Sequence, residues 1–444
     1  MLRAVAPETG TTVTAGNPPG WKIGLALVSL ALSLLLWLNG LVDSLSRPSV
    51  GGDLNRRQLE LAALAAPSLP AELRPLLAGQ DPLAALAEAL QQEIDQAGES
   101  GTPPATDLLL EQALLQQRRS GTNPTPTLLE QLQASGDSSG LLQQWRCEAL
   151  QGAAACDPAA SGRRAAIQLM AVTVLPVLLL LLGIGLLLRE LWLLWRGRLP
   201  AAPALTGPPL GGVDVVLLIA GGFVVIGELL TPLLVTPLLK AAMTRLAITS
   251  PLMEGLNVVA LYLSLMAGPL LILALMLRGL GQPPRGGWLM FRWQPLAATL
   301  APALKGLLLV LPLVSLVGWL QGQIWGDPGG SNPLLELVLN SHDLPALACF
   351  GFTAVVLAPL FEETIFRGVL LPVAGRRLGP VWGVLLSAGV FAVAHLSLGE
   401  LLPLLVLGLG LGWLRWNGGR LGSCVLMHAF WNALTFTNLV VLGW

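Results

Sequence analysis

The chain has 444 residues, of which 54% are apolar and only 11% are charged. An average soluble domain carries about 25% charged residues, so this charge content is too low for an ordinary soluble protein. The formal net charge of −1 offers no basic surface for nucleic acid, and no nucleic-acid partner is expected. The composition instead predicts an all-α, polytopic membrane protein, a bundle of about eight or nine transmembrane helices in a lipid bilayer.

A helix crosses the hydrocarbon core of a bilayer in roughly 20 apolar residues. Residues 23–42 form the first uncharged run of that length, which is longer than the roughly 7–15 apolar residues of a signal peptide. We therefore expect an uncleaved anchor there. The eight further predicted spans are residues 165–188, 215–239, 255–277, 306–325, 344–370, 378–398, 401–414 and 421–442.

Lys and Arg in the short loops predict the orientation of these spans, because cytoplasmic loops are enriched in both. Arginines follow the second, fourth, sixth and eighth spans, namely Arg189, Arg196, Arg198, Arg278, Arg285, Arg292, Arg376, Arg377, Arg415 and Arg420. The opposing loops 321–343 and 397–400 contain neither residue type, and Lys240 and Arg245 are the exception. This alternation predicts a cytoplasmic N-terminus.

Charge is concentrated between Gly51 and Arg164, where 14 Asp or Glu and 8 Arg occur without any Lys or His. We predict a helical soluble insert over residues 43–164, outside the cell, with helices near 82–96 and 125–133. Cys147 and Cys156 lie nine residues apart in it, and both a disulfide and two unpaired cysteines are compatible with that spacing. The predicted division is residues 1–42 (tail and first anchor), 43–164 (insert), 165–299 (spans two to four) and 300–444.

Ionisable side chains inside apolar helices are costly and usually functional. The sixth predicted span carries Glu362, Glu363 and Arg367. Glu363 and Arg367 are four residues apart, in the favourable order for an ion pair. Glu362 lies about 100° further around the helix and is expected to be the freer carboxylate.

Two of the three histidines in the chain also lie in predicted spans, His395 in the seventh and His428 in the ninth, where Asn432 shares a helical face with His428. Antiparallel helices joined midway between Glu362 and His395 would bring both to a depth of roughly 20–25 Å, at about 1.5 Å per residue. His428 fits less well, because it lies only seven residues beyond the start of its span. Either the ninth helix starts deeper, or the eighth span is misplaced.

A carboxylate with two imidazoles can bind a metal ion or activate water, and an amide can stabilise an oxyanion. Taken singly, each histidine is about as likely to be a packing residue as a functional one. The Glu–Arg pair is likewise about as likely to be a structural ion pair as part of a site. Their gathering in three neighbouring spans favours a site. The sequence has no H-E-x-x-H helix, which excludes an ordinary zincin.

Three motifs, each in its own predicted hydrophobic helix, carry a family resemblance: Glu-Glu-x-x-x-Arg at 362–367, Phe-x-x-x-His at 391–395 and His-x-x-x-Asn at 428–432. Together they resemble the CPBP family of intramembrane proteases. This family is also called the abortive-infection or type II CAAX protease family, and it includes the Ras-converting CAAX endopeptidase. The resemblance covers about residues 300–444 and does not extend to the insert.

The resemblance implies an intramembrane endopeptidase that cleaves a membrane-embedded or lipidated protein or peptide. On this pattern Glu362 and His395 would activate the attacking water. His428 and Asn432 would bind a metal or stabilise the oxyanion.

The resemblance also implies that Glu363 and Arg367 hold the site together. A divalent metal such as zinc would have Glu362, His395 and His428 as ligands, and a metal-free, glutamate-dependent mechanism is the competing account. Specificity for prenylated substrates is not implied.

Two other classes of function compete with a protease. A proton-coupled transporter could use Glu228, Glu362 and the two intramembrane histidines as a relay. Against it, the inverted repeats of many transporters are not apparent in the sequence. A catalytically idle scaffold could bind partners through the insert, but every motif position of the protease family is occupied.

Overall fold

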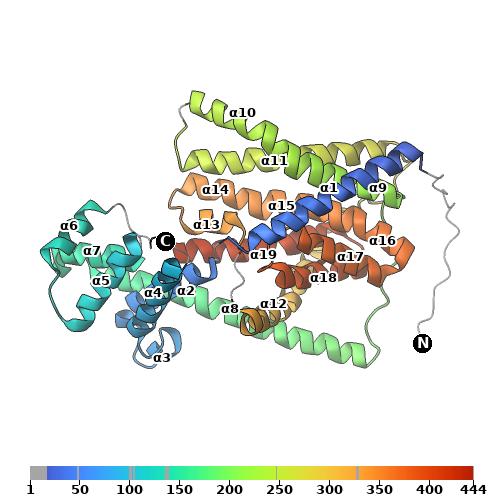
Figure 1. Cartoon of the computed structure of the whole chain (residues 1–444). Coiled ribbons are helices and arrows are strands. Elements are labelled where there is room, and N and C mark those ends of the chain that lie inside the picture. The colour runs from blue at the N-terminus through green and yellow to red at the C-terminus, as the bar shows by residue number, and fades with distance from the viewer. Residues whose placement is uncertain are drawn as a thin grey trace.

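The computed structural model describes residues 18–47, 50–99, 103, 106–135, 140–246, 248–326 and 330–443, so parts of the predicted insert fall outside it. Every regular element in these ranges is helical (Figure 1). The first helices are α1 (Gly20–Ser44), α2 (Val50–Ala65), α3 (Arg74–Leu77), α4 (Pro82–Glu99), α5 (Thr106–Ser120), α6 (Pro126–Ala134) and α7 (Gly140–Gln151). The remaining helices are α8 (Pro158–Trp195), α9 (Gly212–Val216), α10 (Thr231–Arg245), α11 (Leu252–Arg278), α12 (Ala297–Trp325), α13 (Pro333–Leu339), α14 (Leu344–Phe352), α15 (Ala358–Glu363), α16 (Leu371–Leu378), α17 (Pro380–Val393), α18 (Leu401–Gly418) and α19 (Leu421–Gly443).

Three π-helical segments continue these helices without a break. They are η3 (Leu217–Leu230) between α9 and α10, η4 (Thr353–Leu357) between α14 and α15, and η5 (Thr364–Leu370) between α15 and α16. Short 3₁₀ turns occur at Ala66–Ser68 and Ala153–Ala155 in the insert.

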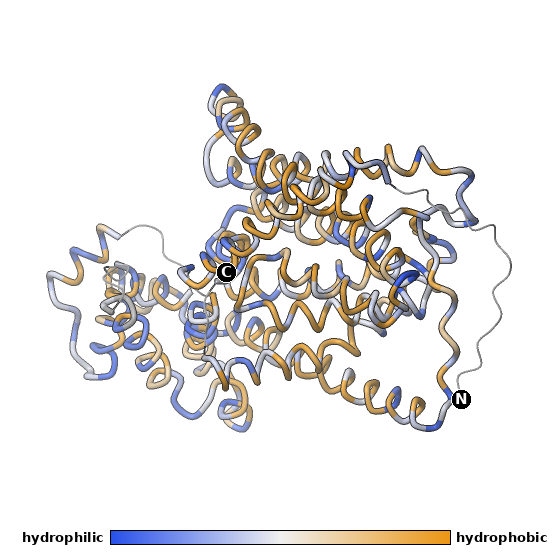
Figure 2. Tube along the Cα trace, turned by 45° about the vertical axis from the view of Figure 1, so that its right-hand side comes forward, coloured by the Kyte–Doolittle hydropathy of each residue, from blue (hydrophilic) through white to orange (hydrophobic). Residues whose placement is uncertain are grey.

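In the described part of the chain, eight helical runs are long and apolar enough to cross a membrane. They are Gly20–Ser44, Pro158–Trp195, Gly212–Arg245, Leu252–Arg278, Ala297–Trp325, Leu344–Leu378, Leu401–Gly418 and Leu421–Gly443. The seventh predicted span corresponds to α17, which is apolar but only 14 residues long. Figure 2 shows the bundle helices as mainly hydrophobic, with polar residues over the insert. The chain is an all-α polytopic membrane protein, as predicted.

The predicted arginine-rich loops and the loops 321–343 and 397–400 gather at opposite ends of the bundle, and Arg47 after α1 lies at the end of the latter. At the end away from the insert, Arg376 donates to the carbonyls of Gly207 and Pro208, and Arg415 donates to the carbonyl of Thr206. The predicted arginine-rich loops therefore lie on one side of the molecule.

At the end beside the insert, the two arginine-free loops contact one another and the end of α1. The side chain of Gln321 donates to the carbonyl of Gly399 at 2.5 Å, and the amide of Leu398 donates to Oγ of Ser44 at 3.2 Å. Arginine-rich and arginine-free loops therefore alternate between the two ends, as the sequence predicted. The assignment of one end to the cytoplasm stays a prediction.

The insert has a hydrophobic core of its own. Leucines of α4, α5, α6 and α7 pack around Trp145, which is 4% exposed. The N-terminal turns of α8 complete a second apolar cluster against α2 through Ala165 and Leu169. With 38 residues at about 1.5 Å each, α8 is roughly 57 Å long, so one helix serves both the insert and the second span (Figure 1).

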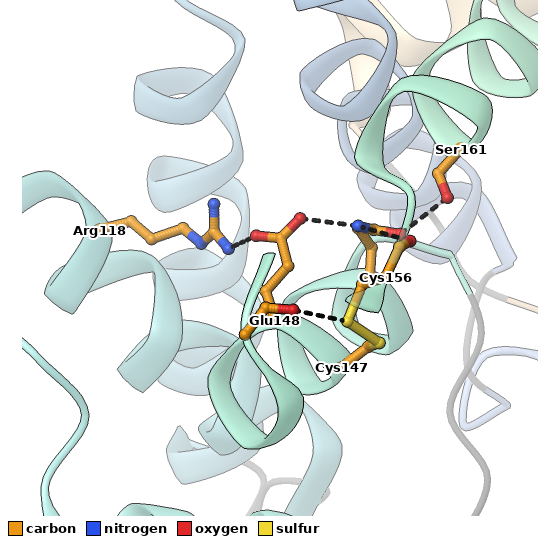
Figure 3. The surroundings of a disulfide bond; sticks show 7 residues. Arg118, Cys147, Glu148, Cys156 and Ser161 are labelled. Atoms are coloured by element: carbon orange, nitrogen blue, oxygen red, sulfur yellow. Dashed lines mark hydrogen bonds and ion pairs between the residues drawn. A yellow bond between two sulfur atoms is a disulfide. The ribbon is translucent and has the colours of Figure 1, made fainter. Parts of the chain in front are cut away.

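A disulfide between Cys147 and Cys156 closes the junction of the insert with α8 (Figure 3). Beside it, Gln144 donates to Glu148 at 2.7 Å and accepts from the hydroxyl of Ser161 in α8 at 2.7 Å. The sequence left this pairing open. The structure joins α7 by a covalent link to the segment just before α8, and by the hydrogen bond of Ser161 to α8 itself.

The seventh predicted span is wrong at its C-terminal end. It was expected to be helical to residue 398, but α17 ends at Val393 and a turn follows. Leu396 there has a φ of 50°, in the left-handed region that is unfavourable for leucine and ends a right-handed helix. The sequence predicted His395 inside a helix, whereas the structure places it in this turn.

The depth problem at His428 is resolved by the start of α19. The first two amides of that helix, from Leu421 and Gly422, donate to the carbonyls of Met290 and Phe291. Leu421 lies beside Gly368, since a Cβ placed on Gly368 would be 3.2 Å from the Leu421 side chain. Gly368 is ten residues before the end of α16, so Leu421 is well below the turn that follows α16. The ninth helix thus starts deeper than the turn between the sixth and seventh runs.

Candidate active site

Two adjacent carboxylates end α15, inside the continuous helical run Leu344–Leu378. The run is π-helical on both sides of α15, a local geometry that is frequent at functional sites. The side chain of Glu363 is fully buried, and its Oε1 accepts a 2.9 Å hydrogen bond from Nη1 of Arg367, which is also fully buried. The two residues form the ion pair expected from their spacing.

The guanidinium of Arg367 holds three helical runs together. Its Nη2 donates to the carbonyl of Gly408 in α18 at 3.1 Å, and its Cζ lies 4.3 Å from the ring centroid of Phe391 in α17. A Cβ at Gly408 would lie 3.1 Å from Cα of Ala388, so a small residue is needed where α18 crosses α17. The ion pair consequently ties Glu363 to α17 and α18 through Arg367.

His428 joins this buried pair from α19. Its Nδ1 lies 3.0 Å from Oε1 of Glu363, and the ring is 3% exposed. A carboxylate paired with arginine only accepts hydrogen bonds, so Nδ1 of His428 carries the proton. In the neutral ring, Nε2 is then a lone-pair acceptor.

His395 has the same tautomer for a different reason. Its Nδ1 lies 2.8 Å from the carbonyl oxygen of Phe391, which can only accept, so Nδ1 donates and Nε2 is again the acceptor. The imidazole packs edge-on at 4.7 Å from the ring centroid of Phe391. The next residue along the turn, Leu396, has its carbonyl bound by Nη2 of Arg47 at 2.6 Å, so the loop after α1 holds the backbone beside His395.

Glu362 lies where these groups meet. Its Oε1 accepts a 3.1 Å hydrogen bond from the hydroxyl of Tyr262 in α11. Its Oε2 is buried without a hydrogen-bond partner among the described residues and lies 3.9 Å from Nε2 of His395 and 3.9 Å from Nε2 of His428. Oε2 of Glu362 thus lies close to two further acceptor atoms, with no hydrogen-bond donor to it from the part of the chain that the structure describes. Converging acceptors of this kind suit a water molecule, which brings two O–H donors, or a cation.

The chemistry of these donors matches a divalent metal. Imidazole nitrogen and carboxylate oxygen are zinc ligands, and metal-bound histidines usually donate their other N–H to a carbonyl or a carboxylate, as both histidines do here. Within the described ranges, however, no group of three or more His, Cys, Asp and Glu side chains is placed to hold a metal ion. The donor types fit, but a closed ligand cage has not formed.

Asn432 lies one turn beyond His428 on α19. Its Nδ2 donates to the carbonyl of Ala354 in η4 at 2.7 Å, which ties α19 to the helical run of the two glutamates. None of the hydrogen bonds between described residues joins it to the other predicted site residues. An amide has a second N–H, and that donor is left for another partner.

Sequence reasoning missed Tyr262 and Arg47. Tyr262 is the only tyrosine of the chain and lies 100 residues before the carboxylate that it contacts. The signal for it was a hydroxyl inside an apolar span, because a buried tyrosine hydroxyl normally needs a polar partner. Nothing in the sequence indicated the contact of Arg47, because a charged residue commonly flanks a membrane span.

A comparison with family models places these residues in a known class. The model described as type II CAAX prenyl endopeptidase Rce1-like matches residues 344–434, which include all three motifs. This segment is therefore similar to the CPBP, or type II CAAX, proteases, which supports the resemblance carried by the three motifs. The CAAX protease domain so defined begins with α14 and ends within α19, so α11 with its tyrosine lies outside it.

Other comparisons reach less far. An uncharacterized 24.3 kDa protein of Escherichia coli is 32% identical over 103 residues, which cover 22% of this chain and 48% of that protein. The chain therefore spans about half the length of this curated relative. Residues 51–137, within the insert, match a domain of unknown function, DUF8675. No solved structure matches the chain.

Proposed function

We propose that the protein is an intramembrane endopeptidase in which Glu362 and His395 activate the water that attacks a peptide bond. The family of residues 344–434 supports a membrane endopeptidase acting on a membrane-associated protein. The identity of the water-activating groups, and a membrane-embedded or lipidated substrate, are our extension of that finding.

The observation that carries the proposal is the unpartnered Oε2 of Glu362, 3.9 Å from each of two imidazole nitrogens. A water in this space donates one proton to Oε2 and the other to Nε2 of His395. As the water oxygen bonds to the carbonyl carbon of the substrate, its proton passes to the carboxylate of Glu362. When the C–N bond then breaks, the carboxyl group returns this proton to the leaving amine. General-base help of this kind contributes typically about 10²–10⁴-fold.

The oxyanion that forms needs a donor about 3 Å away. Nε2 of His428 accepts but does not donate in its neutral tautomer, so His428 can serve the oxyanion only after it takes up a second proton. The free N–H of Asn432 is the other donor on the same helix. Glu363 and Arg367 do not face the water, and their part is to hold His428 in place.

A divalent ion such as zinc would be held by Glu362, His395 and His428, and it would polarise the substrate carbonyl and acidify the attacking water. Treatment with a membrane-permeant zinc chelator separates the two accounts. Cleavage that is lost and then restored by zinc would favour the metal, and cleavage that persists would favour the carboxylate acting alone.

A transporter receives less support from the same geometry. The third intramembrane carboxylate, Glu228, accepts a 3.0 Å hydrogen bond from Nε1 of Trp37 in α1. None of the hydrogen bonds and ion pairs between described residues connects Glu228 to Glu362 or to either histidine. A proton relay through these groups therefore lacks its first link.

The proposal is tested by mapping new protein termini. Wild-type protein and Glu362→Gln are reconstituted into separate liposomes with solubilised membrane proteins of the host, and newly formed N-termini are labelled and identified by mass spectrometry. We expect a set of termini that wild type produces and Glu362→Gln does not.

The matched control is Glu228→Gln, which neutralises an intramembrane carboxylate outside the site. It should produce the wild-type set of termini. An identical set from wild type and Glu362→Gln would contradict the proposal, and the absence of any new terminus would favour the idle scaffold.

A further inference from the structure

The single tyrosine of the chain contacts the carboxylate at the centre of the site. Tyr262 lies in the middle of α11, and its hydroxyl donates to Oε1 of Glu362 at 3.1 Å. The contact joins residues 100 positions apart, and it comes from a helix that precedes the CAAX protease domain. The domain therefore does not contain every group that touches its central carboxylate.

Packing alone does not account for a tyrosine at this position. The ring lies against an apolar cluster that includes Phe361 and Leu265, for which phenylalanine would serve equally well. The hydroxyl adds a polar group inside the bundle, and burying one is unfavourable unless it is hydrogen-bonded. Glu362 is the partner that the structure provides.

The hydrogen bond makes the two oxygens of Glu362 unequal. Oε1 is occupied by the phenol, whereas Oε2 remains unpartnered and faces the two imidazoles. Occupying one oxygen also fixes the plane of the carboxylate about its last torsion, which is otherwise broad. Catalytic geometry is sensitive to this, since misplacement by about 1 Å can cost 10²-fold in rate.

We propose that Tyr262 is a positioning residue for Glu362, which holds Oε1 and thereby directs Oε2 toward His395 and His428. The active unit then extends beyond residues 344–434 and includes α11. This inference rests on the proposed function for its catalytic meaning, but the contact itself can be tested without any cleavage.

The first experiment uses the fact that the chain contains one tyrosine. Full-length protein labelled with carbon-13 at the phenol carbon gives one tyrosine signal by NMR. We expect Glu362→Gln to move this signal, because the acceptor of the phenol changes from a carboxylate to an amide. The control Glu228→Gln should leave it in place. A signal that Glu362→Gln does not move would overturn the proposal.

The second experiment measures cleavage kinetics of the substrate found by terminus mapping. Tyr262→Phe keeps the ring and removes only the hydroxyl, and we expect kcat to fall roughly tenfold with KM unchanged, as for the loss of one hydrogen bond made to an ionised group. Ser264→Ala is the control, because it removes a hydroxyl of the same helix that donates to the carbonyl of Ala260. This variant should retain wild-type kcat.

The two failures are distinguishable. If wild type cleaves nothing, the proposed function fails, and the NMR signal still decides whether Tyr262 holds Glu362. If wild type cleaves and Tyr262→Phe has unchanged kcat, the positioning role is wrong while the protease proposal stands.

Discussion

Neighbouring glutamates in one helix have opposite surroundings. Glu363 accepts from an arginine and lies beside a histidine N–H, and its side chain is fully buried. The side chain of Glu362 is 14% exposed, and one of its oxygens has no hydrogen-bond partner in the described ranges. The first arrangement suits a fixed structural charge, and the second fits the catalytic role that we propose for Glu362.

We predict that Glu363→Gln destabilises the protein strongly. The change leaves the guanidinium of Arg367 as a buried charge without its counter-ion, which typically costs about 3–5 kcal/mol. Thermal unfolding of the purified protein in detergent should show a clear fall in Tm.

Glu362→Gln is the matched comparison, since it removes the adjacent charge but breaks no ion pair with arginine. It should unfold close to wild type. If Glu362→Gln proves the more destabilising of the two, the assignment of the carboxylates is inverted.

At the scale of the elements, the motif spacing predicted the helical runs better than their ends. The i,i+4 pair in the sixth run and the antiparallel register of Glu362 with His395 follow from helical geometry, and both are present. The end of α17 did not follow, because neither Gly nor Pro marks it and a leucine adopts the left-handed conformation there. The contacts of Tyr262 and Arg47 also escaped prediction, since sequence spacing carries no information across 100 or 349 residues.

The insert contains a buried charge cluster around one arginine. Arg56 of α2 forms ion pairs with Asp53 at 3.3 Å, Glu93 of α4 at 3.3 Å, Glu111 of α5 at 3.5 Å, and Glu60. Four carboxylates thus surround one guanidinium. Burial, together with the nearby charge of Glu60, raises the pKa of Glu111 to about 8.

This pKa predicts that the insert loses stability as the pH rises. In the unfolded chain the pKa of a glutamate is about 4.3, so between that value and about 8 the folded state binds the extra proton. The contribution of Glu111 is fully present below about pH 4.3 and is lost as the pH rises through 8. Burial also raises the pKa of Glu60 and of Glu93, so both act in the same direction.

Hydrogen exchange of the full-length protein in detergent measures this effect. After correction for the intrinsic exchange rate, amides of α5 should be less protected at pH 8.5 than at pH 6. Glu111→Gln should abolish most of the difference, and the exposed Glu130→Gln should retain it. Equal protection at both pH values in wild type would show that Glu111 is ionised throughout.

At the scale of the whole molecule, the loops at the two ends differ in charge and in chemistry. The insert carries the disulfide, and at the opposite end of the bundle Arg376 and Arg415 bind carbonyls of the loop before α9. Figure 1 shows the insert at one end and α9 and α16 at the other. Disulfides persist in oxidising compartments, and arginine-rich loops stay in the cytoplasm. Both features favour an insert outside the cell.

Cysteine accessibility tests this orientation. In intact cells, a membrane-impermeant maleimide should label a cysteine at exposed Glu88 of the insert and should reach a cysteine at exposed Arg377 only after permeabilisation. Labelling of position 377 but not 88 in intact cells would reverse the topology.

The fold class followed from composition and apolar run lengths, because lipid permits few alternatives to a helix bundle. The meeting of three distant motifs also followed, since their side chains are costly in lipid unless they pair. The depth of α19 could not be predicted from the sequence. It depends on backbone hydrogen bonds to Met290 and Phe291, which no pattern in the sequence marks.

The central claim is that Glu362 and His395 act on one water as a unit, and a double-mutant comparison tests it most directly. Turnover of the identified substrate is measured for wild type, Glu362→Ala, His395→Ala and the double mutant. Each single change should cost roughly 10²–10⁴-fold, and the double should cost little more than either alone, because groups that serve the same step are not additive. Near wild-type cleavage by His395→Ala, or losses that simply multiply in the double mutant, would contradict this account.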